Sequence, residues 1–254
     1  MKQEYLFICG CPRSGTTALV RLLNAHKSIG IGMERYKYYA SQQNVHKINS
    51  NAFKAENFFN LQDEQTNLKW TQYYDDLRIK YQQGIDIVGD KYPHYYRFYD
   101  QINSNLNNVK WIFIVRNVVD VAKSYNVRSA NPEDGWPSEA NYKRAVVHWN
   151  ESLAKTWKYQ KSNYNPNLFI CEYERLFGYE TDYLKSLLNF LNVNFDSNIK
   201  AYFERMEQEW NTKQQYRSKP KANLNKLEIQ YIEANAKQNL KNNLVNKFDK
   251  LVKV

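Results

Sequence analysis

The chain has 254 residues, of which 43% are hydrophobic and 24% are charged, and three are cysteines. This length predicts one folded domain, residues 1–254, with a substantial core. The odd number and the spacing of Cys9, Cys11 and Cys171 exclude a disulfide framework and a cysteine zinc site. The net charge of +10 allows two classes of partner, nucleic acids and small anionic molecules.

The sequence has no apolar run of about 18 residues, so we expect no membrane span. From Lys2 the chain runs directly into an apolar segment without a small-residue cleavage site, so we expect no signal peptide. Unpaired cysteines are typical of a reducing compartment, and a cytoplasmic location is the simplest expectation.

Residues 4–26 predict a strand, a turn bracketed by glycines, and a helix. Residues 5–9 form a short apolar run typical of a buried strand, and three leucines then recur at helical spacing. A turn that leads into a helix N-terminus directs backbone N–H groups and the positive end of the helix dipole to one place. We therefore predict a phosphate cradle in the turn, Gly10-Cys11-Pro12-Arg13-Ser14-Gly15-Thr16-Thr17.

This turn is close to the phosphate loop of nucleoside triphosphatases but lacks its lysine. Gly10 and Gly15 have the spacing of the G-x-x-x-x-G-K-[ST] pattern, and Thr16 stands at the lysine position. Arg13 supplies a planar guanidinium instead, which suits phosphate or sulfate oxygens. For the glycine pair taken alone, an ordinary tight turn at a helix start is the alternative.

The segment Pro12-Arg13-Ser14-Gly15-Thr16-Thr17 resembles the 5′-phosphosulfate-binding loop of sulfotransferases that use 3′-phosphoadenosine-5′-phosphosulfate (PAPS). Its arginine form is closer to the tyrosylprotein and bacterial members than to the cytosolic small-molecule enzymes. The resemblance implies an α/β fold of the P-loop type, in which three α/β/α layers surround a central parallel sheet. It also implies that the whole segment binds the cofactor and that Arg13 takes part in catalysis.

Glu34 is the candidate base. We predict a loop over residues 27–33, which contain two glycines, and this loop leads to Glu34. A carboxylate beside a cationic cradle can take a proton from a hydroxyl, whereas a surface glutamate paired with Arg35 or Lys37 is the alternative. The resemblance implies the catalytic role, because the base glutamate of tyrosylprotein sulfotransferases follows the loop arginine at the distance that separates Arg13 from Glu34.

Residues 85–89 predict a second strand, which ends on Asp90-Lys91-Tyr92-Pro93. Functional groups of open α/β sheets gather at the carboxyl ends of strands. The pattern G-[DE]-K-x-P at this place resembles the second lysine motif of the family. This resemblance implies that Lys91 contacts the leaving phosphosulfate and stabilises the charge that develops as the S–O bond breaks.

Residues 109–115 predict a buried strand and residues 118–129 the helix that follows it. Arg116 ends the strand, and Ser124 and Arg128 share one face of the helix because they are four residues apart. This arrangement resembles the family's 3′-phosphate site, which implies that these three residues hold the 3′-phosphate. A strand, a turn and a helix with chance polar residues is the alternative.

A strand over residues 167–171 leads into a segment that resembles the family's Y-E-x-L motif. By that resemblance Tyr173 approaches the adenine of the nucleotide, although a core aromatic fits equally well. The analysis of apolar periodicity also predicts four helices, over residues 94–106, 138–161, 181–191 and about 223–240.

Two segments add to the single domain. Residues 49–83 are polar with scattered aromatic residues and predict a helical insertion, an acceptor lid, over the active-site face. Residues 211–254 hold ten Lys or Arg and three Asp or Glu, a net charge of +7, which fits either a solvated basic face or a field that attracts anions. By resemblance to the family's basic closing loop, Lys219 and Lys221 contact the nucleotide.

Together the motifs predict a sulfotransferase that uses PAPS and releases 3′,5′-adenosine bisphosphate (PAP) by in-line displacement, with Glu34 as base. We expect no metal, because arginine, lysine and backbone dipoles can meet the developing charge. We expect a soluble enzyme of a bacterial or viral type. Its expected partner is an acceptor with a hydroxyl group, which is a glycan, a lipid, a peptide tyrosine or a small molecule. The alternatives are a P-loop kinase or triphosphatase with Asp90 as the strand-end acid, and a basic protein that binds nucleic acid.

Overall fold

The computed structural model describes residues 3–62, 65–66, 71–162, 166–216 and 224–252. Within these residues, five strands form one parallel sheet in the order β2-β3-β1-β4-β5. The strands are β1 (Glu4–Gly10), β2 (Ile29–Met33), β3 (Ile87–Lys91), β4 (Val109–Val115) and β5 (Leu168–Glu172). The predicted α/β fold with a central parallel sheet is confirmed.

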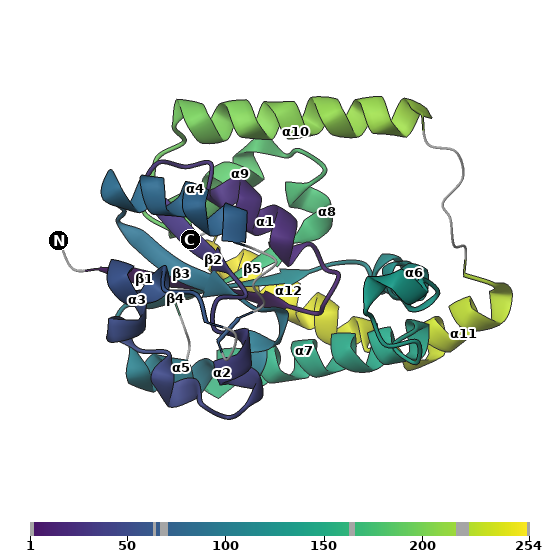
Figure 1. Ribbon diagram of the computed structural model, residues 1–254. Coiled ribbons are helices and arrows are strands. Elements are labelled where there is room, and N and C mark those ends of the chain that lie inside the picture. Colours follow the sequence, from purple (N-terminus) through teal and green to yellow (C-terminus); the bar gives the residue numbers. More distant parts are fainter. Residues whose placement is uncertain (1–2, 63–64, 67–70, 163–165, 217–223, 253–254) are drawn as a thin grey trace.

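Helices cover both faces of the sheet and complete the three layers (Figure 1). One face carries α1 (Thr16–Leu23), α4 (Thr71–Gln82), α9 (Thr181–Phe190) and α10 (Ser197–Tyr216), and the other carries α5 (Tyr99–Asn105), α7 (Tyr142–Ser162) and α12 (Gln238–Val252). The shorter or peripheral helices are α2 (Lys37–Ser41), α3 (Ala55–Phe58), α6 (Val118–Ser129), α8 (Tyr173–Leu176) and α11 (Lys226–Asn235). No described helix is long and apolar enough to cross a membrane.

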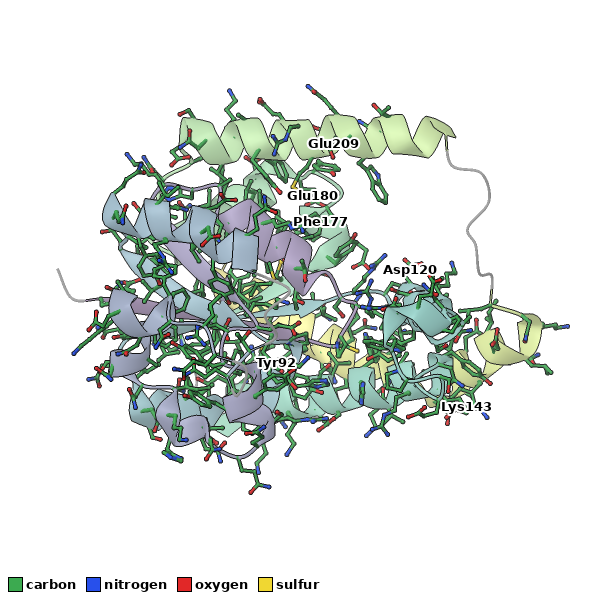
Figure 2. The ribbon with its side chains drawn as sticks, viewed as in Figure 1. Tyr92, Asp120, Lys143, Phe177, Glu180 and Glu209 are labelled. Carbon is green, nitrogen blue, oxygen red and sulfur yellow. The ribbon has the colours of Figure 1, made fainter. Side chains whose placement is uncertain are left out.

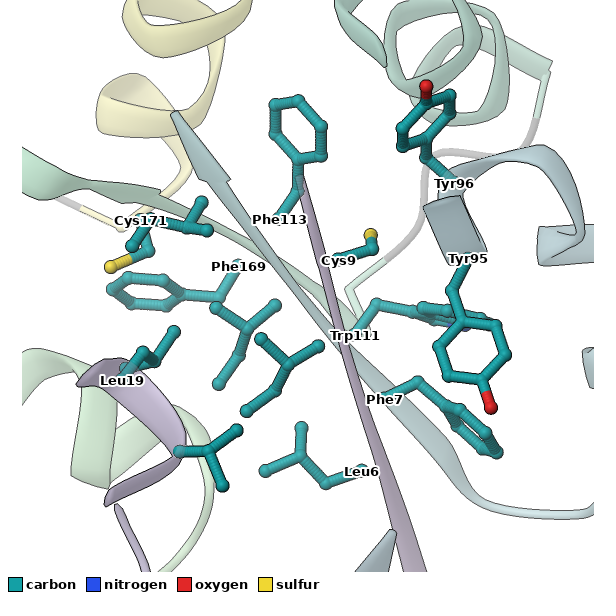
Figure 3. Close-up of a cluster of buried hydrophobic side chains, with 14 of the residues drawn as sticks. Leu6, Phe7, Cys9, Leu19, Tyr95, Tyr96, Trp111, Phe113, Phe169 and Cys171 are labelled. Atoms are coloured by element: carbon teal, nitrogen blue, oxygen red, sulfur yellow. The ribbon is translucent and has the colours of Figure 1, made fainter. Parts of the chain in front are cut away.

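The core lies on both faces of the central strand β1 (Figure 3). Residues 6–9 have no exposed surface, and successive side chains alternate between the two helical layers. On one face the Phe7 ring packs against Trp111, at 5.1 Å between ring centroids, and against Tyr95 at 5.3 Å. Burial on both faces explains why the strand is a continuous apolar run, which is typical of parallel sheets.

The predicted loop over residues 27–33 is wrong, because the edge strand β2 occupies most of it. Its two glycines stand where side chains of other segments approach the strand. A Cβ atom added at Gly30 would lie 2.5 Å from Ile85, and one added at Gly32 would lie 2.9 Å from the Asp90 carboxylate. Glycine in this strand therefore makes room for neighbouring side chains, and it is no sign of a turn.

Other elements differ from the predictions in their bounds. Strand β4 and helix α6 match residue for residue, whereas β3 begins two residues later than predicted and Lys91 is its last residue. The predicted helix over 94–106 divides into a 3-10 helix, Pro93–Arg97, and α5. The last predicted helix divides into α11 and α12 because Ala236 between them has an extended backbone. Helix α10 was not predicted.

The stability of the sheet can be tested at its centre. Replacing the fully buried Ile112 of β4 with alanine should lower the free energy of unfolding by about 2–5 kcal/mol, because a cavity is left in a well-packed layer. The same replacement at Ile79 on α4, which is 59% exposed, should change it by less than about 0.5 kcal/mol. Urea denaturation measures both, and equal losses would contradict this placement of the core.

Candidate active site

A cavity of about 560 Å³ lies between the start of α1, the turn after β4, and helices α8 and α10. Helix α10 crosses above α1 and contributes Glu209, which Figure 2 labels on that helix. Among the described residues, two acidic side chains line the cavity, Glu34 and Glu209, and four basic ones, Arg13, Arg21, Arg116 and Arg128. The excess of guanidinium groups makes the cavity suited to a ligand with several negative charges.

The turn between β1 and α1 has the backbone of an anion cradle. Arg13 and Gly15 have left-handed conformations, with φ of 73° and 96°, and α1 begins at Thr16. No side chain in the described part of the chain caps this helix end, and the first N–H groups of a helix have no partner within the helix. The buried Ser14 hydroxyl also has no hydrogen-bond partner among the described residues. The predicted phosphate cradle thus has unused donors and the positive end of the helix dipole.

Tyr173 forms a wall of the cavity. Its ring packs against Gly15 so closely that a Cβ atom there would lie 2.5 Å from it. The Arg116 guanidinium lies over the same ring, with its carbon 4.2 Å from the centroid. The side chain is half-buried and lines the cavity, so it is available to a ligand while it also packs against the cradle.

The structure brings the two predicted anion motifs together. Arg13 Nε donates to Ser124 Oγ at 2.9 Å, and Arg116 Nη1 donates to the Arg13 carbonyl at 3.3 Å. Arg128 pairs with Asp134 and also lines the cavity. Partial burial, and the positive charges of Arg128 and Arg116, lower the pKa of Arg13. The cluster is therefore short of negative charge, which a bound anion would supply.

Glu34, Lys91 and Thr17 form a chain of polar contacts at the edge of the cavity. Lys91 Nζ lies 3.1 Å from Glu34 Oε1 and 3.3 Å from Thr17 Oγ1. Lys91 is 1% exposed, so its contact with the cavity is indirect. The Glu34 and Thr17 side chains, which its ammonium contacts, both line the cavity. The Lys37 ammonium lies 3.5 Å from the second oxygen of Glu34.

Two lysines keep the Glu34 carboxyl ionised. Burial by itself raises its pKa, but the ammonium groups of Lys91 and Lys37 outweigh that effect and lower the pKa below its ordinary value. The pairing with Lys37, which was the alternative to a catalytic role, is present as well. Glu34 is thus an unprotonated carboxylate at neutral pH that lies beside the phosphate cradle.

Asp90 is not placed to bind a metal ion. It has no exposed surface and accepts hydrogen bonds from the Arg35 and Tyr36 backbone N–H groups and from the Tyr95 hydroxyl, at 2.8, 3.0 and 2.6 Å. Burial raises the pKa of Asp90 to about 6, although these hydrogen bonds act in the opposite direction. The triphosphatase alternative therefore lacks both the acidic metal ligand and the phosphate-loop lysine that this class of enzyme requires. The described residues contain no group of three or more His, Cys, Asp or Glu that could hold a metal ion.

Several residues that line the cavity were not predicted from the sequence. Arg21 lies four residues after Thr17 on the same face of α1, a spacing that could have revealed it. Ala18, which follows the cradle on α1, was also missed. The remaining missed residues, Tyr202, Met206 and Glu209, belong to the helix that was not predicted. Lys219 and Lys221 lie outside the described residues, so their predicted contact with a nucleotide stays a prediction.

The electrostatic role of Lys91 is testable. Replacing Lys91 with methionine should raise the pKa of the Glu34 carboxyl above its ordinary value, because burial then acts unopposed by the nearer ammonium. Replacing Lys37, which is 33% exposed, should raise it less, since water screens its charge. Carbon-13 NMR titration of the carboxyl measures both shifts, and a larger shift for Lys37→Met would show that Lys37 dominates.

Comparison with known proteins gives an independent view of this arrangement. The protein-family model described as "Sulfotransferase family" matches residues 6–197 of this chain. An uncharacterized protein of Aquifex aeolicus (strain VF5) is 23% identical over 211 residues, which cover 78% of this chain and 27% of that protein. The chain thus spans about a quarter of the length of this relative.

Two solved structures share the fold. The sulfotransferase domain from the Curacin biosynthetic pathway is 20% identical, with a TM-score of 0.54 and coverage of 78% of this chain and 77% of that one. The sulfotransferase domain of the Synechococcus PCC 7002 olefin synthase is 17% identical, with a TM-score of 0.50 and coverage of 92% and 95%. Because the family model matches most of the chain, from residue 6 to residue 197, this protein belongs to the sulfotransferase family.

Proposed function

We propose that this protein transfers a sulfuryl group from PAPS to a hydroxyl or phenol acceptor. The observation that carries the proposal is the meeting of two anion motifs and one buried carboxylate–ammonium pair around a single cavity. A ligand with phosphate groups at both ends of a nucleoside matches two such motifs better than a ligand with one cluster of phosphates. Family membership supports the same reaction class.

In this proposal the two ends of the nucleotide bind at two different parts of the cavity. The turn from Pro12 to Thr17 would hold the 5′-phosphosulfate on the N-terminus of α1. Arg116, Ser124 and Arg128 would hold the 3′-phosphate on the other side of Arg13. The aromatic and apolar side chains of the cavity, Tyr173, Tyr202 and Met206, would contact the adenine.

In the proposed reaction, Glu34 takes the proton from the acceptor oxygen as that oxygen forms its bond to sulfur. The bond between sulfur and the bridging oxygen of the 5′-phosphate breaks in line, and PAP is released. Arg13, the helix dipole and Lys91 stabilise the negative charge that develops on the phosphate. Lys91 can act in this way because its ammonium already lies between Glu34 and Thr17.

The proposed acceptor is defined only as a compound with a hydroxyl group. A glutamate base suits a glycan, a lipid, a peptide tyrosine or a small alcohol equally, and residues 49–83 would cover the acceptor. We place the reaction in a reducing, cytoplasmic compartment because Cys9, Cys11 and Cys171 are all free thiols that the fold buries.

Nucleotide preference is the first test. Calorimetric titration at physiological salt should show that PAP binds at least about tenfold more tightly than 5′-AMP or ATP, because the others lack the 3′-phosphate that Arg116 would contact. Equal and weak binding of the three nucleotides would mean that the cavity is a general anion site, and the proposed donor would be wrong.

The 3′-phosphate contact can be tested at one residue. Arg116→Ala should weaken PAP binding by about tenfold or more, since a charge-assisted hydrogen bond contributes about 1.5–3 kcal/mol. The control Arg144→Ala removes the same charge from an exposed position on α7 that does not line the cavity, and should leave PAP affinity nearly unchanged. Equal losses of PAP affinity in both variants would mean that Arg116 acts only through the net charge of the protein.

The base can be tested separately from nucleotide binding. Glu34→Gln should lower kcat for sulfuryl transfer by at least about 100-fold, in the range of general base catalysis, while PAP affinity stays within about threefold. Glu204→Gln, at a 56% exposed position on α10, should leave both unchanged. Normal turnover in Glu34→Gln would remove Glu34 from the mechanism.

A further inference from the structure

Asp90 and Lys91 are neighbours on β3 whose side chains point to opposite faces of the sheet. Lys91 reaches Thr17 at the start of α1, whereas Asp90 reaches the turn that follows β2. Both side chains are buried, at 1% and 0% exposure. The same strand end therefore contacts the phosphate cradle on one face and the backbone after Glu34 on the other.

Glu34 has a backbone conformation that non-glycine residues seldom adopt, with φ of 58°. Hydrogen bonds on both sides hold it. Its N–H donates to the Lys91 carbonyl at 2.8 Å, and its carbonyl accepts from Thr66 Oγ1 at 2.9 Å. The next two N–H groups, of Arg35 and Tyr36, donate to the two carboxylate oxygens of Asp90.

Two of the three hydrogen bonds to the Asp90 carboxylate come from this turn, and the third comes from the Tyr95 hydroxyl, at 2.6 Å. The side chain of the buried Arg35 does not take it as an ion partner, because its guanidinium donates to the carbonyls of Asn57, Phe58 and Asn60. Gly32 on the neighbouring strand leaves room for the carboxylate, since a Cβ atom there would lie 2.9 Å from Asp90 Oδ1. Because Gly32 leaves room and the Arg35 guanidinium donates elsewhere, the Asp90 carboxylate can accept from the backbone after Glu34 as well as from the Tyr95 hydroxyl.

We infer that Asp90 is a positioning residue, which holds the turn after β2 so that the Glu34 carboxylate lies against the Lys91 ammonium. This inference rests on the proposed function for the part that concerns catalysis. Its structural part, the dependence of the Glu34–Lys91 contact on Asp90, stands without any assumption about the reaction. The two parts need separate measurements.

The structural part is tested by a double-mutant cycle on the pKa of Glu34. In the wild type, Lys91→Met shifts the carboxyl pKa upward because it removes the nearest positive charge. In an Asp90→Asn background the same replacement should shift it by less than about half as much, since Glu34 no longer lies against Lys91. Comparing the two Lys91 effects cancels the change of charge at Asp90 itself. An undiminished shift would overturn the inference, whether or not the protein transfers sulfuryl groups.

The catalytic part is tested by kinetics. Asp90→Asn should lower kcat for sulfuryl transfer at least about tenfold, with the KM for PAPS and the affinity for PAP changed less than about threefold. Added to Glu34→Gln, it should lower kcat by no more than about twofold further, because Asp90 acts through Glu34. If Asp90→Asn lowered kcat as much in the Glu34→Gln background as in the wild type, Asp90 would have a role that is separate from Glu34. Absence of transfer by the wild type would instead overturn the proposed function and leave the pKa cycle as the decisive test.

A matched control separates positioning from stability. Asp196 also accepts two backbone N–H bonds, from Lys27 and Ile199 at 3.3 and 2.9 Å, near the start of α10. Asp196→Asn should lower the thermal stability but leave kcat and the Lys91-dependent pKa shift intact. If Asp90→Asn does not fold, Gly32→Ala provides the second variant. Its Cβ atom would lie 2.9 Å from Asp90 Oδ1 and 3.0 Å from both Arg35 Cβ and Phe58, so it should shift the turn after β2 relative to the Asp90 carboxylate without removing that carboxylate. The expected results are the same as for Asp90→Asn, and a normal kcat with an undiminished pKa shift would overturn the inference.

Discussion

The arrangement of the site depends on the buried ammonium of Lys91, which contacts Glu34 on one side and Thr17 on the other. A buried lysine without a negative partner loses its charge or destabilises the fold. Burial does lower the pKa of Lys91, and the Glu34 carboxylate opposes that effect. The requirement to keep this one charge paired therefore fixes the distance between the phosphate cradle, the end of β3 and the turn after β2.

The strand order explains why these groups meet. Strand β1 lies between β3 and β4, and the chain leaves β1 toward one edge and later returns to the other. Ligands of open α/β sheets bind where the strand order reverses in this way, at the carboxyl ends of the strands. Here the cradle follows β1, Lys91 ends β3 and Arg116 follows β4, so all three lie at the same edge of the sheet. The close fit at Gly10, where a Cβ atom would lie 2.4 Å from the Ile114 carbonyl, keeps the ends of β1 and β4 together.

Much of this could be predicted from local sequence. The cradle, Lys91 and Arg116 each directly follow or end an apolar strand, so the strand pattern alone brings them to one edge of the sheet. Three features could not be predicted in this way, because each depends on contacts between distant segments. The glycines of β2 leave room for the side chains of Ile85 and Asp90, which come more than fifty residues later in the chain. Helix α10 is largely polar and closes the cavity through Tyr202 and Met206, and Asp90 binds a backbone turn that has no sequence signal of its own.

The charges of the site also connect nucleotide binding to the base. The Lys91 ammonium contacts the Glu34 carboxylate and the neutral hydroxyl of Thr17, and the positive charges of Arg128 and Arg116 act against that of Arg13. In the proposed reaction an anion on the cradle relieves that repulsion and competes with Glu34 for the Lys91 ammonium. Because Lys91 is the main cause that lowers the pKa of Glu34, this competition makes Glu34 a stronger base. In the proposed reaction its basicity would thus rise when the sulfuryl donor is bound, which is when an acceptor proton has to be removed.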